Sequence, residues 1–459
     1  MKVLFIFLLC LSQWSSAAVF NVNSELDTVD TSPGDGTCMD ASGNCSLRAA
    51  LMETNELAGA DEIYLPRSSV YNITIPPMAS GDDAHGDFDI LDSLQLSIMD
   101  PATPITDPSE LPVLDAGGMS RVLEANAVEF ASIDVEMFGL LLRNGNTGVD
   151  STSNDMGGGL LIESGVDNFI ISNSVITQNQ SNNGAGLLLF NSNSEIRNSD
   201  ISYNILTSGL ANPGGTAIRN GLGALVVTDS SIHHNTKNAD VTACKATIRH
   251  NNTGTDLFVY NTLITHNGIA EISGGTSQCV DGVYSQNSSM FVINSTISNN
   301  GGRGVRFFDF MPDNFDMWVK HSIIAHNALG DCGSINTGIV NFGDVNGGYN
   351  IVSDGSCSLP VATGNLENTD PLLGARESLY PGSLYYVVRR PMLGSPAIDA
   401  GNPLAPSNIN TDRCNMQDQR QFTRPQDGDG DGSSTCDIGA IEVDYDRIFN
   451  NGFEALPRP

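Results

Sequence analysis

The sequence has few basic residues, and this scarcity excludes whole classes of partner. Its 459 residues carry 21 Lys and Arg against 53 Asp and Glu, a formal net charge of −32. Only four lysines occur, Lys2, Lys237, Lys245 and Lys320. Neutralising the phosphates of a nucleic acid or the headgroups of an anionic membrane requires clustered Lys and Arg. We therefore expect neither a nucleic acid nor an anionic membrane surface as a partner.

Long hydrophobic runs are also lacking. The run from Val3 to Leu11 is too short to span a bilayer, and small residues follow it, as in a secretory signal peptide. Cleavage is expected near Ala17 or Ala18, so residues 1–18 are predicted to be the signal segment. We expect an exported chain without a transmembrane segment, secreted or retained at the outer cell surface.

Cysteine is infrequent, and no CxxC spacing occurs. Removing Cys10 with the signal segment leaves eight of the nine cysteines, an even number. In an oxidising compartment such a set predicts disulfides rather than the alternative of free or metal-binding thiols. Sequential neighbours are predicted to pair: Cys38 with Cys45, Cys244 with Cys279, Cys332 with Cys357, and Cys414 with Cys436.

What the sequence does contain is an internal repeat, the phrase N-S-x-I-x-x-N. Its copies are residues 173–179, 198–204, 229–235, 261–267, 294–300 and 321–327, with Leu141 in residues 138–144 as an earlier copy. The central apolar residues are Ile176, Ile201, Ile232, Ile264, Ile297 and Ile324.

Two further apolar columns interleave with the phrase. Two residues before each copy stand Ile171, Ile196, Val227, Val259, Val292 and Val319. Between the copies stand Leu160, Leu187, Ile218, Ile248, Val283, Val305 and Ile339. Each unit therefore contains short β segments separated by Gly, Asn and Ser turns.

This pattern predicts an all-β fold, a right-handed parallel β-helix in which each repeat forms one coil. Equivalent strands would stack about 4.8 Å apart, and the apolar columns would fill a narrow core. The closing Asn side chains would hydrogen-bond from coil to coil. A propeller would need about 40 residues per blade, whereas the spacing here is uneven and shorter. A tandem sandwich array would lack the one-to-one match of columns.

A solenoid needs closed ends, because an open coil exposes its core. A short capping helix is predicted over residues 45–58, with Ser46 or Asn44 as its N-cap. We expect the cap and first coils in residues 19–125, regular coils in 126–359, and a closing module and tail in 360–459.

Several motifs carry a family resemblance. Residues 45–50 (CSLRAA) resemble the signature of the "CSLREA" family of secreted bacterial β-helix proteins, with Ala49 in place of the Glu of the family. Residues 86–90 and 139–145 resemble the next blocks of that family. Residues 394–401, 418–420 and 436–440 resemble the closing module called choice-of-anchor Q, with Gln421 where that module has Gly. Residues 447–454 resemble an ending of exported bacterial proteins. The resemblance implies the pectin-lyase-like fold and no particular activity.

One outward column contains a cluster of cations. The residues after the third apolar column are Leu161, Leu188, Arg219, Arg249, Tyr284, Arg306 and Val340. Three arginines and a tyrosine on consecutive coils would extend about 14 Å. Arg binds carboxylates in a bidentate manner, and Tyr offers a face to a sugar ring. We predict that Arg219, Arg249, Tyr284 and Arg306 bind an acidic polysaccharide; the alternative is local ion pairing with Asp281 and Asp309.

Catalytic constellations are weaker in the sequence. Asp309, Asp313 and Asp316 near Arg306 could serve a calcium-dependent lyase, but a plain acidic loop explains them equally. His234, His266 and His326 share the position before the closing Asn, where a structural turn is favoured over a metal site. No acidic pair on adjacent coils is predicted.

The run Asp427-Gly-Asp429-Gly-Asp431-Gly has the alternating carboxylates of a calcium loop. Its twelfth position is Ile438 instead of Glu, so a standard EF-hand is excluded, and a solvated loop is the alternative. No other cofactor is expected.

Together these features predict a monomeric, secreted, non-catalytic binding or adhesion protein that recognises a polysaccharide or a cell-surface glycan. The alternatives are a polysaccharide lyase or glycoside hydrolase acting on uronate polymers, and a purely structural surface protein.

Overall fold

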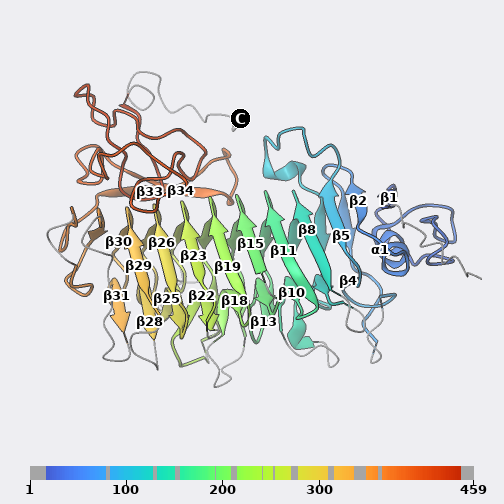
Figure 1. Cartoon of the computed structure of the whole chain (residues 1–459). Helices are drawn as coiled ribbons and strands as arrows, with labels where there is room; N and C mark the ends of the chain where they lie inside the picture. The colour runs from blue at the N-terminus through green and yellow to red at the C-terminus, as the bar shows by residue number, and fades with distance from the viewer. Residues whose placement is uncertain are drawn as a thin grey trace, which may run out of the picture.

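The chain winds into a right-handed parallel β-helix whose coils stack along one axis (Figure 1). The computed structural model describes residues 17–78, 83–127, 132–149, 156–191, 193–207, 214–239, 241–251, 254–269, 278–308, 315–334, 348–359 and 364–445. No helix among these residues is long and apolar enough to cross a membrane. The predicted fold class is confirmed.

Three long sheets, each purely parallel, form the walls. The ten-stranded β1 sheet contains β1 (Val19–Asn21), β2 (Asp61–Leu65), β5 (Leu94–Ile98), β8 (Ile133–Phe138), β11 (Val166–Ser172), β15 (Asn193–Arg197), β19 (Ala224–Thr228), β23 (Leu257–Tyr260), β26 (Met290–Ile293) and β29 (Met317–Lys320). The ten-stranded β3 sheet contains β3 (Val70–Asn72), β6 (Val113–Asp115), β9 (Leu141–Arg143), β12 (Val175–Thr177), β16 (Asp200–Ser202), β20 (Ser231–His233), β24 (Leu263–Thr265), β27 (Thr296–Ser298), β30 (Ile323–Ala325) and β32 (Ile351–Val352). The nine-stranded β4 sheet contains β4 (Phe88–Ile90), β7 (Leu123–Ala125), β10 (Leu160–Ile162), β14 (Leu187–Leu189), β18 (Gly215–Asn220), β22 (Lys245–Asn251), β25 (Val280–Gln286), β28 (Val305–Phe308) and β31 (Cys332–Ser334).

Smaller elements complete the chain. A short parallel sheet contains β13 (Gln180–Ser181), β17 (Ile205–Leu206) and β21 (Thr236–Lys237). The pair β33 (Leu373–Ser378) and β34 (Val387–Pro391) is antiparallel. Among the described residues, helical segments include α1 (Leu47–Glu56), η1 (Pro108–Glu110) and η2 (Thr147–Val149).

The three predicted apolar columns are in register from strand to strand. The Ile column runs through β12, β16, β20, β24, β27 and β30. The second column pairs in the β1 sheet and the third in the β4 sheet. These side chains are fully buried and form one continuous core.

Two details of the columns differ from the prediction. Ile176 pairs with Leu142, and Leu141 pairs with Val175, so the early copy begins one residue later than predicted. A slip of one residue turns every side chain to the other face of a strand, and Leu142 is therefore the core residue. Ile339 lies outside the described residues, and Val305 pairs with Cys332 in β31.

The phrase encodes two left-handed turns. In the six copies from residue 173 onwards, the first residue has a φ between 43° and 54° and the sixth has a φ between 55° and 60°. Asn and Asp tolerate this conformation better than other residues with a side chain. The closing Asn follows the second turn and forms the predicted ladder. The backbone N–H and the Nδ2 of each Asn donate to the Oδ1 of the next one at 2.9–3.2 Å, in the order Asn179, Asn204, Asn235, Asn267, Asn300 and Asn327. The N–H of Gly145 donates to Asn179 Oδ1 at 2.8 Å.

The Ser of the phrase forms a second ladder, which we did not predict. Each backbone N–H at this position donates to the hydroxyl of the next coil at 3.1–3.4 Å, through Ser174, Ser199, Ser230, Thr262, Ser295 and Ser322. The last N–H donates to Asn350 Oδ1 at 3.0 Å. Hydroxyls therefore satisfy backbone donors where the chain turns between sheets.

The N-terminal end is closed as predicted. Helix α1 lies at that end of the coils (Figure 1), and its residues Leu47, Ala50 and Leu51 belong to the central core. The Ser46 hydroxyl accepts a hydrogen bond from the N–H of Ala49 at 3.0 Å, so Ser46 is the N-cap. The helix covers the first coil with its apolar face.

The C-terminal segment lies along the side of the solenoid, on the β3 sheet (Figure 1). Leu141 and Val175 of this sheet pack with Tyr380 and Tyr386, and Ile323 packs with Ala397 and Ile438. Outward positions of β12, β16, β20, β24, β27 and β30 are buried as a result. The C-terminal segment thus covers one face of the solenoid.

Candidate functional site

The predicted cationic column lies on the outward side of the β4 sheet. Arg219 pairs with Arg249, Arg249 with Tyr284, and Tyr284 with Arg306, on β18, β22, β25 and β28. Val340 lies outside the described residues, and Gly333 follows Arg306 in β31. The four side chains are thus brought together on consecutive coils.

Much of this column is covered. Leu161 and Leu188 are buried because the glycine turns before their strands fold over them. Gly157 and Gly184 adopt φ values of 63° and 60°, and a Cβ added to either would stand about 3 Å from the Leu side chain. Arg249 and Tyr284 are also buried, whereas Arg219 and Arg306 are half-buried. The guanidinium groups that solvent can reach are therefore those of Arg219 and Arg306.

Tyr284 stands between two guanidinium groups. The Cζ atom of Arg249 lies 3.6 Å from its ring centroid, and that of Arg306 lies 4.8 Å away. Since these arginines belong to the strands on either side, cations occupy the ring faces. Tyr284 therefore does not offer a sugar the free face that we expected.

The charges of this cluster are incompletely balanced. Arg306 Nη1 donates to Asp281 Oδ2 at 3.1 Å, the local pairing that we considered as the alternative. Arg249 donates to Gln286 Oε1, while its Nε and Nη1 have no hydrogen-bond partner among the described residues. Arg219 donates to the carbonyl of Asn220 at 3.3 Å. Burial lowers the pKa of Arg249 to about 9 and that of Arg219 to about 10.

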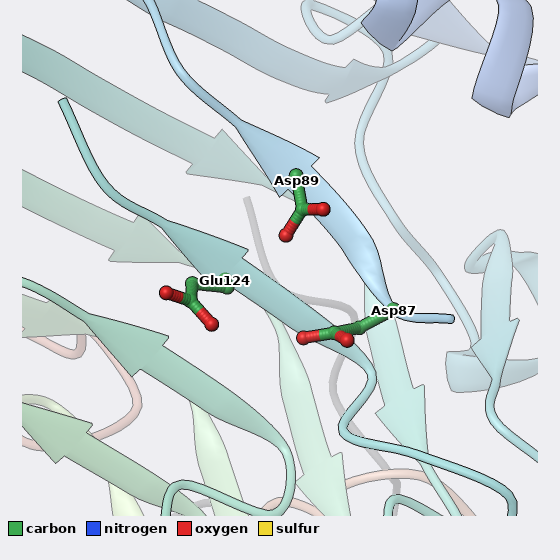
Figure 2. Close-up of side chains that lie close together, drawn as sticks. All are labelled: Asp87, Asp89 and Glu124. Atoms are coloured by element: carbon green, nitrogen blue, oxygen red, sulfur yellow. The ribbon is translucent and has the colours of Figure 1, made fainter. Parts of the chain in front are cut away.

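The same outward column begins with two acids. Asp89 of β4 pairs with Glu124 of β7, and Glu124 pairs with Leu161 of β10. Asp87 lies beside them, and one oxygen from each of the three carboxylates lies within 4.8 Å of the others (Figure 2). The outward face of the β4 sheet thus carries acids at one end and arginines at the other.

Arg121 forms ion pairs with two of these acids. Its guanidinium, only 2% exposed, forms an ion pair with Asp87 at 3.0 Å and another with Glu124. Burial, together with the neighbouring Asp87 and Glu124, raises the pKa of Asp89 to about 9. Burial also raises the pKa of Glu124, which Arg121 opposes. These effects favour the protonated form of Asp89 at neutral pH, while Arg121 lies against Asp87 and Glu124.

Sequence reasoning missed this acidic pair. Asp87 and Asp89 flank the buried Phe88, the alternation of a half-buried strand, so both carboxylates could have been assigned outward. The coils that contain β4 and β7 precede the first copy of the phrase. The sequence therefore did not show that Asp89 aligns with Glu124 on the next coil. Of the three loop acids considered for a lyase, Asp309 and Asp313 lie outside the described residues, and Asp316 directly precedes β29.

The Asp-Gly run is a compact loop. Asp427 accepts hydrogen bonds from Gly430 and Gly432 at 2.7 and 2.9 Å. Asp399 joins Asp427 and Asp429 in a group of three carboxylates, of which Asp431 is not a member. Burial raises the pKa of Asp399, as do the charges of Asp429 and Asp427. Hard cations prefer such oxygen ligands.

The three histidines considered for a metal site occupy the second left-handed turn of the phrase. His234, His266 and His326 have φ values of 55°, 56° and 60°. His234 stacks on His266, with ring centroids 5.7 Å apart. These residues therefore occupy the turn that we favoured over a metal site.

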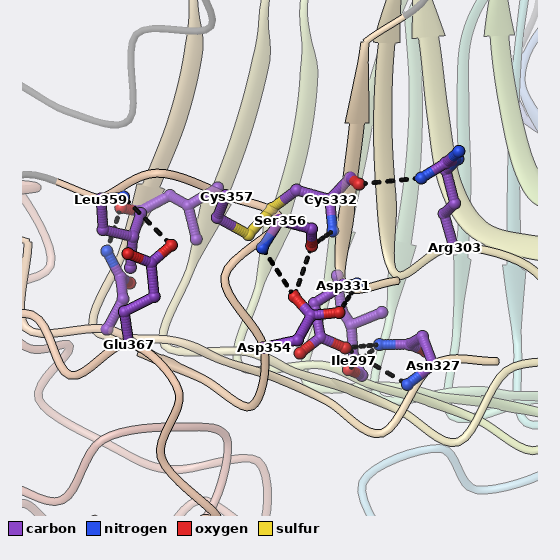
Figure 3. The surroundings of a disulfide bond; sticks show 12 residues. Ile297, Arg303, Asn327, Asp331, Cys332, Asp354, Ser356, Cys357, Leu359 and Glu367 are labelled. Carbon is purple, nitrogen blue, oxygen red and sulfur yellow. Dashed lines mark hydrogen bonds between the residues drawn. A yellow bond between two sulfur atoms is a disulfide. The ribbon is translucent and has the colours of Figure 1, made fainter. Parts of the chain in front are cut away.

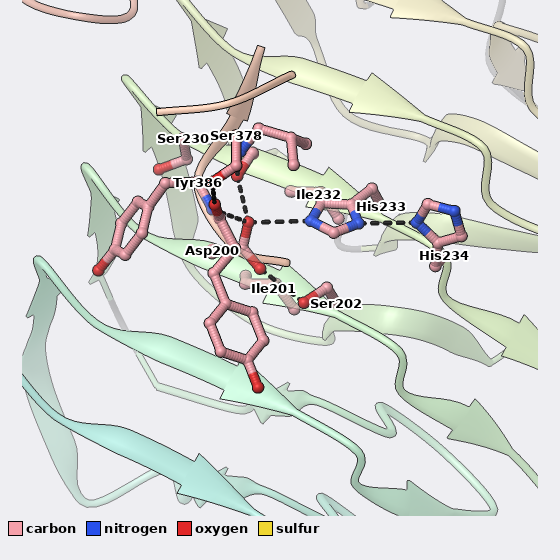
Figure 4. A network of polar contacts seen from close by, with 12 residues as sticks. Asp200, Ile201, Ser202, Ser230, Ile232, His233, His234, Ser378 and Tyr386 are labelled. Carbon is pink, nitrogen blue, oxygen red and sulfur yellow. Dashed lines mark hydrogen bonds and ion pairs between the residues drawn. The ribbon is translucent and has the colours of Figure 1, made fainter. Parts of the chain in front are cut away.

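A buried polar network anchors the closing module (Figure 4). Asp200 accepts hydrogen bonds from Ser202 Oγ at 2.6 Å, from the N–H of Tyr386 at 2.7 Å, and from Ser231. His233 Nε2 lies 3.0 Å from the same carboxylate, whose pKa is lowered by His233 and the hydroxyls although burial opposes this. The Ser, His and Asp do not form a nucleophilic relay, because both Ser231 and His233 bind Asp200. The network is fully buried and its role is structural.

All four predicted disulfides are present: Cys38–Cys45, Cys244–Cys279, Cys332–Cys357 and Cys414–Cys436. Figure 3 shows Cys332–Cys357 beside the end of the Asn ladder, where Asp331 Oδ1 replaces the next Asn and accepts from Asn327 at 3.0 and 3.2 Å. Four disulfides are typical of an oxidising compartment. They are consistent with export.

No protein-family model matches the chain, and no curated protein matches it. Among solved structures, it is similar to the crystal structure of pectate lyase Pel9A, with 12% sequence identity and a TM-score of 0.45, over 94% of this chain and 97% of the other. A likeness this distant carries no information about activity. The CSLREA and choice-of-anchor Q resemblances stay predictions.

Proposed function

We propose that this protein is a secreted, non-catalytic binding protein that recognises an acidic polysaccharide at the arginine end of the β4 sheet. Retention at the outer cell surface is part of this proposal. The ligand would present carboxylates to Arg219 and Arg306 along the outward face, with Arg249 adding positive potential from beneath.

One observation carries the proposal: three guanidinium groups lie on neighbouring coils, and the described residues supply them with a single ion pair, Arg306 with Asp281. Burying cations without counter-ions is costly, and a bound anion would remove that cost. Since the chain has only 21 Lys and Arg against 53 Asp and Glu, three neighbouring arginines support a dedicated anion site.

Binding to polygalacturonate and alginate, measured by calorimetry, tests the proposal. The double substitution of Arg219 and Arg306 by Ala should weaken binding at least roughly ten-fold, since each hydrogen bond to a charged group contributes about 1.5–3 kcal/mol. The affinity of the unaltered protein should fall with added salt. Arg197→Ala on the β1 sheet, an exposed arginine paired with Glu195, should change nothing. Equal affinity of the double variant and the unaltered protein would contradict the proposal.

A glycoside hydrolase is the second candidate, favoured by the acids at the other end of the same column. Canonical retaining glycosidases place two carboxyl groups about 5–5.5 Å apart, one protonated as general acid and one ionised as nucleophile. Asp89, with its pKa of about 9, suits the acid, and Glu124 beside Arg121 suits the nucleophile. A lyase acting on uronate polymers would instead need a basic group to take a proton.

Product release separates these candidates. A hydrolase would release reducing ends from the polymer without an unsaturated, ultraviolet-absorbing product, which a lyase would form. Asp89→Asn and Glu124→Gln should abolish release, and Asp134→Asn, at an exposed acid on the β1 sheet, should not. If the unaltered protein releases nothing from polygalacturonate or alginate, the binding function stands alone.

We also propose that calcium binds at Asp399, Asp427 and Asp429 and stabilises the closing module. Millimolar calcium should then raise the melting temperature, and Asp429→Asn should reduce this rise. Asp134→Asn serves as the control. A melting temperature indifferent to calcium would contradict the proposal.

A further inference from the structure

Two adjoining cavities lie where the β1 sheet turns into the β3 sheet, beneath the C-terminal segment. Their volumes are about 260 and 250 Å³, and both open to solvent. Gln421 lines both and stands between them. At roughly 30 Å³ per liquid water, each holds the volume of about eight waters, which is also enough for one six-membered sugar ring.

The first cavity, named here the Asp229 cavity, is lined by side chains that form hydrogen bonds. Its solenoid wall comprises Thr228, Asp229, Tyr260 and Asn261. The C-terminal segment adds hydroxyl and amide side chains, among them Ser407 and Gln417. Its described lining residues include no Lys or Arg. Such a wall suits a ligand that both donates and accepts hydrogen bonds and carries no negative charge.

Asn261 leaves an unsatisfied acceptor in this wall. Its Nδ2 donates to Asp229 Oδ1 at 3.1 Å and to the carbonyl of Gln417 at 2.9 Å. Within the described part of the chain its Oδ1 has no hydrogen-bond partner, although the residue is only 5% exposed. Burial also raises the pKa of Asp229. An unpaired buried acceptor costs about 1–3 kcal/mol, and a ligand hydroxyl that donates to it would remove this cost.

The second cavity, named here the Tyr380 cavity, adds aromatic rings to amides. Phe138, Tyr380 and Tyr386 line it together with Asn173 and Asn198. The rings of Tyr380 and Tyr386 meet edge to face, with centroids 5.5 Å apart. Aromatic faces pack against apolar C–H groups, and the amides can bind hydroxyls at the rim of the same ring.

We propose that these two cavities bind a neutral saccharide, with one sugar ring in each and Gln421 beside the linkage. The site lies at the corner of the coil, away from the β4 sheet, and goes beyond the proposed binding of an acidic polysaccharide. A sugar ring is the ligand that combines an apolar face for the Tyr380 cavity with hydroxyls for Asp229 and Asn261.

Neutral disaccharides test the site directly. Cellobiose, maltose, mannobiose and diacetylchitobiose serve as probes for the full mature protein, with saturation-transfer NMR to detect contact and calorimetry to measure affinity. At least one should bind. Asp229→Asn keeps the shape and the left-handed turn but removes the charge, and should weaken binding roughly ten-fold because charge-assisted hydrogen bonds are about twice as strong as neutral ones. Phe138→Ala should weaken it through the other cavity.

Controls separate this site from the first. The double substitution of Arg219 and Arg306 by Ala should leave disaccharide binding unchanged, while Asp229→Asn should leave polygalacturonate binding unchanged. Gln421 has a φ of 67°, so Gln421→Gly is compatible with the turn and supplies a third variant should another fail to fold. Absence of binding by all four probes, or binding that none of the cavity variants weakens, would overturn the proposal and leave cavities that hold solvent.

Discussion

At the scale of single residues, the closing Asn contributes to stability because it serves two coils at once. Asn235 Oδ1 accepts from the N–H and Nδ2 of Asn204, and Asn235 Nδ2 donates to the carbonyl of Ile201. All of these groups are buried and have no water to replace a lost partner. A single side chain thus satisfies backbone groups at a turn that a strand ladder cannot reach.

Asn235→Ala should therefore lower the free energy of unfolding by about 3 kcal/mol, since it leaves several buried groups without partners. Urea denaturation measures this. Asn168→Ala is the matched control, because Asn168 is exposed and donates to the surface residue Asp134 at 2.7 Å. That change should fall within about 0.5 kcal/mol. Equal losses in the two variants would contradict the role of the ladder.

Asp89 makes stability depend on pH in an unusual direction. Its pKa rises from 3.8 to about 9 on folding, so the folded protein retains a proton that the unfolded chain has lost between these values. The contribution of Asp89 is fully present below pH 3.8 and is lost as pH rises towards 9. Asp89→Asn should flatten this part of the fall in unfolding free energy between pH 5 and 9. Denaturation at several pH values measures it, and Asp134→Asn should retain the slope. A slope unchanged in Asp89→Asn would show that Asp89 is ionised.

At the scale of elements, the disulfides restrain segments of different length. Cys244–Cys279 joins residues 35 apart in the sequence, across the turns that lead into β22 and β25, whereas Cys38–Cys45 joins residues 7 apart before α1. A crosslink lowers the entropy of the unfolded chain more when the loop that it closes is longer.

Replacing Cys244 and Cys279 by Ser should therefore cost about 1.4 kcal/mol more than replacing Cys38 and Cys45 by Ser. Denaturant titration of the two double variants measures the difference. If the shorter loop costs more, native contacts around α1 outweigh the entropy of the unfolded chain. Mass measurement before and after reduction should count eight reducible thiols in the mature protein.

At the scale of the whole molecule, the C-terminal segment forms an outer cover on one of the three sheets. It covers the outward side of the β3 sheet, where Val175 and Ile323 are almost completely buried. Without that cover the outward side chains of Val175, Leu263 and Ile323 would be exposed to water, and exposed apolar groups favour aggregation.

Ending the chain after residue 371 should therefore give a protein that self-associates or fails to stay in solution. Ending it after residue 445 should leave a monomer, since the described cover is intact. Light scattering after size-exclusion chromatography compares the two products. A monomeric, folded product from the shorter chain would show that the solenoid does not need this cover.

Much of the fold was predictable from the sequence, but less of the candidate site. The phrase recurs once in each coil, so the stacking of Ile176 on Ile201 and of Asn179 on Asn204 follows from the repeat. The serine ladder was overlooked because the sequence does not show that each hydroxyl points towards the backbone N–H of the neighbouring coil. The sequence predicted one outward column for Arg219, Arg249, Tyr284 and Arg306. It did not predict that Arg249 is buried or that two guanidinium groups cover the ring of Tyr284, because these contacts depend on side-chain packing and not on the repeat.

The sequence by itself determined the coil, its inward columns, its turns and its disulfide partners, because a repeat applies the same local physics in every copy. Only the tertiary structure decided which outward residues stay accessible and which distant ones meet. Asp89 and Glu124 come together across 35 residues that contain no copy of the phrase, and Asp200 meets Tyr386 across 186 residues. Such contacts arise from how whole segments pack, and local sequence patterns do not encode them.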